Sequence, residues 1–194
     1  YHNNVAGTIS LLEAMQSNGL QNIVFSSSCA IYGIPSSDKI EEDSIQNPIS
    51  PYGNSKLIIE KILIDLSKLK KMNFYSLRYF NAAGADDDLE IGELHDPETH
   101  LIPLAIKSGF NKDYILKIFG SDFNTPDGTA IRDYVHVNDL AEAHYLSLEN
   151  LLNKKKSDFI NLGSGVGFSV LEIIDILRNQ GINIKYEIQN KRDG

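Results

Sequence analysis

Segments with the hydrophobic pattern of strands alternate along the whole chain with segments that have the pattern of helices. Short runs rich in β-branched and aromatic residues indicate strands at 22–26, 74–80, 115–119, 159–162 and 182–188. Apolar residues at helical spacing, with start and stop signals, indicate helices at 3–17, 51–70, 99–110, 137–152 and 170–179. This alternation is typical of a parallel sheet joined by crossover helices, so the sequence predicts an α/β fold.

Composition narrows the class of protein and of partner. Of the 194 residues 42% are hydrophobic and 23% charged, as in ordinary globular proteins. The net charge of −8 argues against a nucleic-acid or anionic-membrane binder, because both partners are themselves anionic. Cys29 is the single cysteine, so no internal disulfide can form and we expect a cytoplasmic protein. No apolar run approaches the roughly 18–20 residues of a membrane span.

Tyr52 and Lys56 have the spacing of a tyrosine next to an activating ammonium group. Residues four apart share one face of a helix, and Ser50-Pro51 is a typical helix start, which puts Tyr52 in the first turn. The helix N-terminus and the Lys56 ammonium both favour phenolate, so we expect a lowered pKa for Tyr52. By itself the spacing is weak evidence, because a surface tyrosine packed on a lysine stem has the same pattern.

A run of three serines, Ser26 to Ser28, ends the first predicted strand. Ligands of parallel sheets bind beyond the carboxyl ends of the strands. A serine hydroxyl at this end can therefore meet a tyrosine at the start of the following helix. We expect one serine to do so and the other two to bond to loop backbone groups.

A serine at a strand end followed by Tyr-x-x-x-Lys resembles the short-chain dehydrogenase/reductase superfamily. The segments 25–33 and 50–56 resemble its extended, nucleotide-sugar branch. Further motifs resemble the UDP-glucose 4-epimerase family in particular, and they lie at 77–81, 84–85, 98–103, 127–129, 132–141 and 161–167. The resemblance covers essentially the whole chain, in the family's motif order.

The resemblance implies a doubly wound, parallel Rossmann-type sheet and part of a smaller α/β substrate-binding domain. It assigns residues 1–98 to the second half of the NAD-binding domain. It assigns residues 99–194 mainly to the sugar-nucleotide-binding region, with some elements returning to the Rossmann domain. The sequence contains no Gly-x-Gly-x-x-Gly or Gly-x-x-Gly-x-x-Gly phosphate loop. We therefore expect the chain to be the middle piece of a longer polypeptide.

The activity implied by the resemblance is reversible epimerisation of UDP-glucose and UDP-galactose at C4, through a 4-keto intermediate and tightly bound NAD. Tyr52 matches the catalytic base, and Lys56 matches the lysine that bonds to the nicotinamide ribose and lowers the tyrosine pKa. Ser28 matches the hydroxyl that bridges Tyr52 and the sugar oxygen, with Ser27 as the alternative. The residues implied to bind the cofactor are Asn3, Ser28, Tyr52, Lys56 and Phe80.

The resemblance also implies a set of residues around the UDP-sugar. They are Ser28, Tyr52, Asn81, His100, Leu101, Lys117, Ile118, Phe119, Arg132 and Arg192. Arg132 and Arg192 match arginines that bind the diphosphate, for which a planar guanidinium is well suited. Ile118 and Phe119 either wall the uracil ring or belong to the core. His100 stands where many relatives have Asn, and it can still donate a hydrogen bond.

Three other features are interpreted as structural. His136 lies between Val135 and Val137 and is expected to be a hydrogen-bonded core histidine. Cys29 is expected to be a small buried side chain. We expect no metal site at His95, Asp96 and Glu98, because their spacing is irregular and the resemblance requires none.

Surplus apolar residues in two helices predict an association surface. The helices near 3–17 and 51–70 carry apolar side chains on more than one face, with Ile59 expected to point outward. The resemblance implies a homodimer through these two helices, and burial within a larger chain is the alternative.

Other functions remain open at this stage. A UDP-pentose or UDP-N-acetylhexosamine 4-epimerase would carry similar motifs. A nucleotide-sugar 4,6-dehydratase is disfavoured, because the Thr-Asp-Glu segment of those enzymes is replaced by serines here. A non-catalytic nucleotide-binding fragment is a third alternative, since the phosphate loop is not in this sequence.

Overall fold

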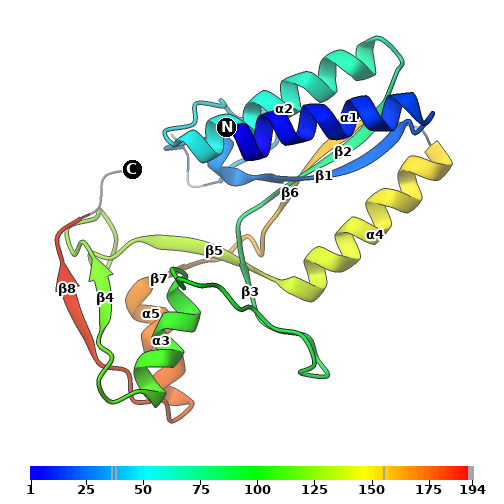
Figure 1. The fold of residues 1–194 in the computed structure, drawn as a ribbon. Helices are drawn as coiled ribbons and strands as arrows, with labels where there is room; N and C mark the ends of the chain where they lie inside the picture. The colour runs from blue at the N-terminus through cyan, green and yellow to red at the C-terminus, as the bar shows by residue number, and fades with distance from the viewer. Residues whose placement is uncertain (36, 38, 155, 192–194) are drawn as a thin grey trace. The chain divides into compact units, whose positions relative to one another are not determined.

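The structure is a computed structural model that describes residues 1–35, 37, 39–154 and 156–191. The chain forms two compact units, each assembled from two stretches of sequence (Figure 1). Unit 1 contains residues 1–82 and 135–163, and unit 2 contains residues 83–134 and 164–194. The chain first passes from unit 1 to unit 2 after residue 82, whereas the sequence analysis places the domain boundary at residue 98.

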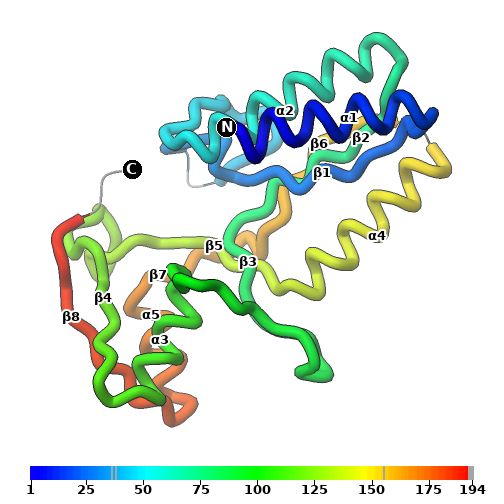
Figure 2. The backbone as a smooth tube through the Cα atoms, viewed as in Figure 1, coloured from blue at the N-terminus to red at the C-terminus, as the bar shows by residue number. Residues whose placement is uncertain are grey.

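Unit 1 is built on a parallel sheet of three strands. Its order is β1 (Asn22–Ser28), β2 (Asn73–Tyr79) and β6 (Asp158–Leu162). The three strands run side by side although β6 follows β2 only after a long excursion of the chain (Figure 2). The helical elements of this unit are η1 (His2–Ala6), α1 (Gly7–Ser17), η2 (Cys29–Ile31), α2 (Pro51–Lys68) and α4 (Val137–Lys154).

The alternating side chains of β2 form the cores on the two faces of this sheet. Phe74 packs with Leu12 of α1 and with Ile59 and Leu63 of α2 in one buried cluster. Tyr75 and Leu77, together with Leu151 of α4, form a second cluster. Because successive strand residues point to opposite faces, α1 and α2 cover one face and α4 covers the other (Figure 1).

Unit 2 contains shorter strands and two helices. Its elements are α3 (Leu101–Phe110), β4 (Leu116–Phe119), β7 (Gly167–Ser169), α5 (Val170–Asn179) and β8 (Tyr186–Gln189). Strand β4 pairs in parallel with β8, and β5 (Ile131–His136) pairs antiparallel with β7. The core of the unit consists of Ala105, Leu116, Ile118, Ile174 and Ile184. Helix α5 begins with a capping box between Ser169 and Glu172, a typical helix start.

The parallel sheets and crossover helices confirm the predicted α/β class. Strands β3 (Asn81–Ala83), β5 and β7 were not predicted, because they are short or only partly apolar and lack a clear alternating pattern. Strand β1 continues through the three serines, two residues beyond its predicted end, because the ladder with β2 reaches Ser28. Strand β8 begins at Tyr186, later than the predicted residue 182.

None of the helices in the described part of the chain is both long and apolar enough to cross a membrane.

Candidate functional site

The carboxyl ends of the strands in unit 1 lie level with one another. Ser28 at the end of β1 is opposite Tyr79 of β2, and Tyr79 is opposite Leu162 of β6. After Ser28 the chain turns into η2, where the Ser28 hydroxyl accepts a hydrogen bond of 3.2 Å from the Ala30 backbone N–H. This is the edge at which parallel sheets bind their ligands, so the serine run ends where the sequence predicts a site.

Helix α2 brings Tyr52 to this edge. The Ser50 side chain caps the helix by accepting a hydrogen bond of 3.1 Å from the Gly53 N–H, and Pro51 occupies the first turn. A Cβ on Gly53 would lie only 2.4 Å from the Ala30 carbonyl oxygen. Only glycine therefore allows the start of α2 to approach η2 this closely, and the approach places Tyr52 beside Ser28.

The Ser28 hydroxyl lies close enough to Tyr52 to act on its pKa. Burial raises the pKa of Tyr52 above its ordinary value, and the Ser28 hydroxyl acts in the opposite direction. The predicted lowering of this pKa is therefore wrong for the structure as described. The physical reason is that burial disfavours the phenolate more than the neighbouring hydroxyl stabilises it.

Lys56 lies one helical turn after Tyr52, on the same side of α2. Its Nζ donates a hydrogen bond of 2.7 Å to the Ser26 carbonyl oxygen. The Nζ is 5.5 Å from the centroid of the Tyr52 ring and 5.1 Å from that of Phe25. Burial lowers the pKa of Lys56. The structure thus brings together Ser28, Tyr52 and Lys56, the three residues predicted to be catalytic.

The other two serines of the run have partners of their own. The Ser27 hydroxyl is fully buried and donates to Glu60 Oε1 at 2.7 Å, so it takes part in the core rather than in the site. Ser26 Oγ lies 2.9 Å from Nε2 of His144, whose Nδ1 is 2.7 Å from the Leu140 carbonyl oxygen. A carbonyl only accepts, so Nδ1 carries the proton and Ser26 donates to Nε2. Ser26 and Ser27 therefore bond to side chains, whereas the sequence analysis predicts bonds to loop backbone groups.

A buried polar network, which was not predicted from the sequence, contacts the serine run through Ser27. Arg78 donates to both oxygens of Glu60, at 3.0 and 2.8 Å, and to the Tyr32 hydroxyl at 2.8 Å. Tyr32 in turn donates to the Asn161 side-chain oxygen at 2.7 Å. A signal was present in the sequence, because Glu60 and Arg78 each interrupt an otherwise apolar segment.

The remaining predicted cofactor residues, Asn3 and Phe80, lie in unit 1. Phe80 is partly buried after β2, as is Asn81, a predicted substrate residue at the start of β3. Asn3 is exposed, and its neighbour Asn4 donates a hydrogen bond of 3.0 Å to the Ser55 hydroxyl on α2. That bond ties the start of the chain to the helix that carries Tyr52 and Lys56.

The residues predicted to bind the UDP-sugar are mostly in unit 2. Lys117 and Arg132 are exposed, and Arg132 donates to the Ile131 carbonyl oxygen at 2.9 Å. Leu101 and Phe119 are partly buried, His100 is exposed, and Ile118 is 2% exposed within the core. Of the two interpretations of Ile118, the core one therefore holds. Arg192 lies outside the described residues.

Two structural interpretations from the sequence need correction. His136 is exposed, and its Nδ1 accepts a hydrogen bond of 3.2 Å from the Asn138 N–H at the start of α4, so it is not a core histidine. Cys29 is only partly buried.

The segment in which no metal site is expected brings histidines and acids together. Glu93, His95, Glu98 and His100 place their ligand atoms within 4.8 Å of one another.

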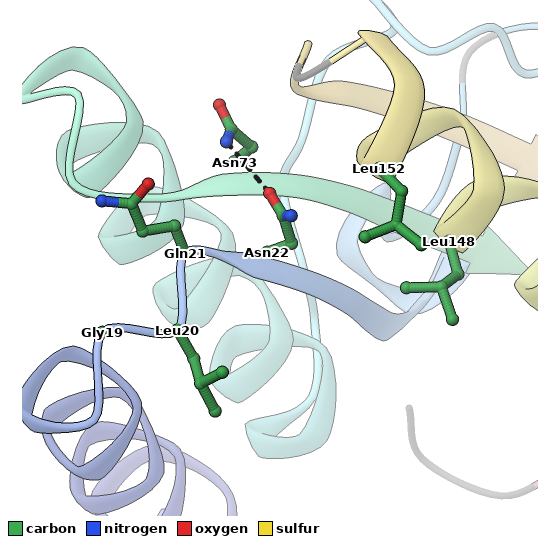
Figure 3. Close-up of a pocket in the computed structure, with 7 residues that line it drawn as sticks. All are labelled: Gly19, Leu20, Gln21, Asn22, Asn73, Leu148 and Leu152. Carbon is green, nitrogen blue, oxygen red and sulfur yellow. Dashed lines mark hydrogen bonds between the residues drawn. The ribbon is translucent and has the colours of Figure 1, made fainter.

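A hollow in unit 1 lies at the opposite end of the sheet from Ser28 and Tyr52. Figure 3 shows its lining, which consists of Gly19, Leu20, Gln21, Asn22, Asn73, Leu148 and Leu152. Asn22 and Asn73 begin β1 and β2, and their side chains are joined by a hydrogen bond of 3.0 Å. Because ligands of parallel sheets bind at the carboxyl ends of the strands, we do not assign the site to this hollow.

The chain is similar to curated UDP-glucose 4-epimerases. The chain is 48% identical over 195 residues to a UDP-glucose 4-epimerase of Lactobacillus helveticus, and 45% identical over 196 residues to one of Rhizobium meliloti. Both alignments cover 100% of this chain, but only 59% and 60% of the relatives. The chain therefore spans about 60% of the length of these relatives.

The chain is also similar to solved structures of UDP-glucose 4-epimerases. The UDP-glucose 4-epimerase from Brucella ovis in complex with NAD matches with a TM-score of 0.93 and 47% identity, over 100% of this chain and 60% of that one. The UDP-glucose 4-epimerase from Bifidobacterium longum in complex with NAD+ and UDP matches with a TM-score of 0.90 and 36% identity, over 100% and 59%. Residues 1–163 match the NAD dependent epimerase/dehydratase family. With the carboxyl-edge serine, the tyrosine and the lysine in place, the chain belongs to the NAD dependent epimerase/dehydratase family.

Proposed function

We propose that the protein containing this chain interconverts UDP-glucose and UDP-galactose at C4 with the help of bound NAD. The observation that carries the proposal is the grouping of Ser28, Tyr52 and Lys56 at the carboxyl edge of the unit 1 sheet. The names of the relatives, UDP-glucose 4-epimerases at 45–48% identity, support this substrate class over the alternatives.

The residues of unit 1 fit the nicotinamide end of the cofactor. The Lys56 ammonium has three N–H donors, and the Ser26 carbonyl accepts from one of them, so others can donate to ribose hydroxyls. The Tyr52 ring centroid lies 5.5 Å from this ammonium, and Phe80 supplies a partly buried aromatic surface directly after β2. When bound, NAD would accept a hydride from sugar C4 and return it.

Tyr52 is the proposed proton acceptor and donor at the C4 oxygen. Tyr52 is 49% exposed, as a residue that must reach a substrate has to be. Ser28 lies next to it and is proposed to bridge it to the sugar oxygen, so that the proton moves along a short path. The Lys56 ammonium, 5.5 Å from the ring centroid, is proposed to stabilise the phenolate once the substrate and the cofactor are bound.

Unit 2 is proposed to hold the UDP part of the substrate. Arg132 is exposed and offers a planar guanidinium, which can bond to two phosphate oxygens at once. His100, Leu101, Lys117 and Phe119 complete the proposed contacts, together with Asn81 and with Arg192.

The proposal includes a homodimer through α1 and α2, in the cytoplasm. Ile9 and Leu11 of α1 and Ile58 of α2 are exposed, at 40%, 53% and 36%. Ile59, which was predicted to point outward, is 1% exposed and packs in the core of unit 1. The apolar surface for association therefore consists of its neighbours rather than of Ile59 itself.

The test is conversion of UDP-galactose to UDP-glucose by the full protein. We expect activity with the natural sequence and a loss of about 10²–10⁴-fold in turnover for Tyr52→Phe, because the ring remains and only the acid–base group is lost. UDP binding should persist in this variant. Tyr145→Phe, which removes the hydroxyl of an exposed tyrosine on α4, is the matched control.

Two outcomes would contradict the proposal. Full activity of Tyr52→Phe would remove Tyr52 from the mechanism. Absence of epimerisation with these two sugars, together with activity on a UDP-pentose or a UDP-N-acetylhexosamine, would transfer the proposal to that substrate.

A further inference from the structure

Four side chains from one loop converge in unit 2. The loop joins β3 to α3 (Figure 1) and carries Glu93, His95, Glu98 and His100. The Nδ1 atoms of His95 and His100 lie 2.8 and 2.7 Å from the same oxygen, Oε1 of Glu93. His100 Nδ1 is also 2.8 Å from Oε1 of Glu98. All four ligand atoms fall within 4.8 Å of one another.

Hydrogen bonding alone does not satisfy this group well. An imidazole Nδ1 carries at most one proton, yet Nδ1 of His100 faces one oxygen of Glu93 and one of Glu98 at nearly equal distances. Within the described part of the chain, neither carboxylate forms an ion pair with a lysine or an arginine. Two carboxylates and two imidazoles thus gather within 4.8 Å of one another, where a cation would neutralise the negative charge of the carboxylates.

One of the ligands is already held in place by the backbone. Oε1 of Glu98 accepts hydrogen bonds of 2.7 Å from the N–H groups of Thr99 and His100, at the start of α3. The carboxylate is therefore oriented by the backbone before any ion arrives.

We propose that Glu93, His95, Glu98 and His100 form a binding site for a divalent transition-metal ion, with Zn²⁺ as the best match. Imidazole nitrogen and carboxylate oxygen are ligands that Zn²⁺ takes in tetrahedral sites, at about 2.0–2.2 Å. Ligand atoms around such an ion are about 3.3–3.5 Å apart. To admit the ion, the observed contacts of 2.7–2.8 Å need to open by about 0.5–0.8 Å, and separations of up to 4.8 Å between the other ligand atoms need to close.

The site has a consequence for His100 that rests on the proposed function. Metal binding through Nδ1 leaves the proton on Nε2. Nε2–H is then a donor of fixed direction, as a residue proposed to contact the UDP-sugar requires. The ion would act here as a positioning device and would take no part in the hydride or proton transfers.

The experiment measures metal binding by the tag-free full protein after removal of metal with a chelator. Zn²⁺ is titrated by calorimetry, and Co²⁺ is titrated by visible absorption, because its d–d bands report the coordination geometry. Glu93→Gln and His95→Gln each remove one ligand. Glu90→Gln is the matched control, since Glu90 is an exposed carboxylate of the same loop outside the cluster.

We expect one Zn²⁺ per chain and a tetrahedral Co²⁺ spectrum for the natural sequence and for Glu90→Gln. Each ligand variant should bind more than about tenfold more weakly, since loss of even an outer partner of a metal ligand costs roughly 10–100-fold. Thermal unfolding of the metal-free proteins verifies that all variants fold alike. Absence of Zn²⁺ binding, or equal binding by Glu93→Gln and Glu90→Gln, would overturn the proposal. These readouts do not depend on epimerase activity, so failure of the proposed function would be seen separately.

Discussion

Glu60 and Arg78 form an ion pair that is almost completely removed from solvent, with each residue 1% exposed. Glu60 lies on α2 and Arg78 on β2, and two nearly parallel hydrogen bonds of 3.0 and 2.8 Å join them. The same Glu60 carboxylate accepts from the hydroxyls of Ser27 and Ser76, each at 2.7 Å. The pair thereby fixes the helix that carries Tyr52 against the strands that end beside it.

We expect Glu60→Gln to be strongly destabilising. Burial alone would lower the pKa of Arg78, but the hydrogen bonds and charge of Glu60 raise it, so the guanidinium stays charged. Removing the carboxylate charge leaves that cation buried without its counter-ion, at a cost of about 3–5 kcal/mol in the free energy of unfolding. Urea unfolding of the full protein measures the change.

The control for this prediction is Asp65→Asn. Asp65 forms an exposed pair with Lys68, at 3.7 Å, and such pairs contribute at most about 1 kcal/mol. Equal stability of the two variants would show that the buried pair does not anchor α2.

Ser28→Ala should move the pH dependence of turnover towards higher pH. The Ser28 hydroxyl acts to lower the pKa of Tyr52, against the rise caused by burial. Without it the pKa of Tyr52 rises further, so less phenolate is present at any given pH below that value. The alkaline pH at which turnover reaches half its maximum is the measured quantity.

Ser67→Ala is the comparison for Ser28→Ala, because Ser67 lies near the other end of α2 and bonds to Ser157. This variant should leave the profile unchanged. An identical profile for both variants would mean that Ser28 does not influence Tyr52.

Arg132→Ala should weaken binding of UDP-sugars with little effect on NAD. A charge-assisted hydrogen bond to a phosphate contributes roughly 1.5–3 kcal/mol, so the dissociation constant should rise by about one to two orders of magnitude. Calorimetry with UDP checks this. Lys61→Ala, which removes an exposed charge from α2, should bind UDP normally, and equal loss of both ligands by Arg132→Ala would indicate misfolding instead.

Leu11→Glu should convert the proposed homodimer of the full protein into monomers. Leu11 is 53% exposed on α1, so the charge is harmless in a monomer but would be buried at the interface. Sedimentation at micromolar concentration distinguishes the two states. Leu152→Glu, at a position 60% exposed on α4, should remain a dimer, and a monomeric natural sequence would refute the interface altogether.

Local sequence patterns were sufficient for most of the helices and for placing Tyr52 and Lys56 on the same helix. Ser50-Pro51 marks the start of α2 because a capping hydroxyl and a proline are both suited to a first turn. Tyr52 and Lys56 share one side of that helix because of its period alone. The short strands β3 and β7 escaped prediction, since a strand of three residues has no period to detect and exists only through its partners.

The sequence by itself determined the α/β class, the helix that carries Tyr52 and Lys56, and the serine run at the end of β1. Only the tertiary structure decided that Ser28 is the serine that acts on Tyr52 and that Ser27 donates a hydrogen bond to Glu60. It also reversed the expected direction of the Tyr52 pKa shift and brought Glu93 and His95 together with Glu98 and His100. The physical reason is that periodicity and capping act over a few neighbouring residues. Burial, electrostatics and side-chain partners depend instead on segments that only folding brings together.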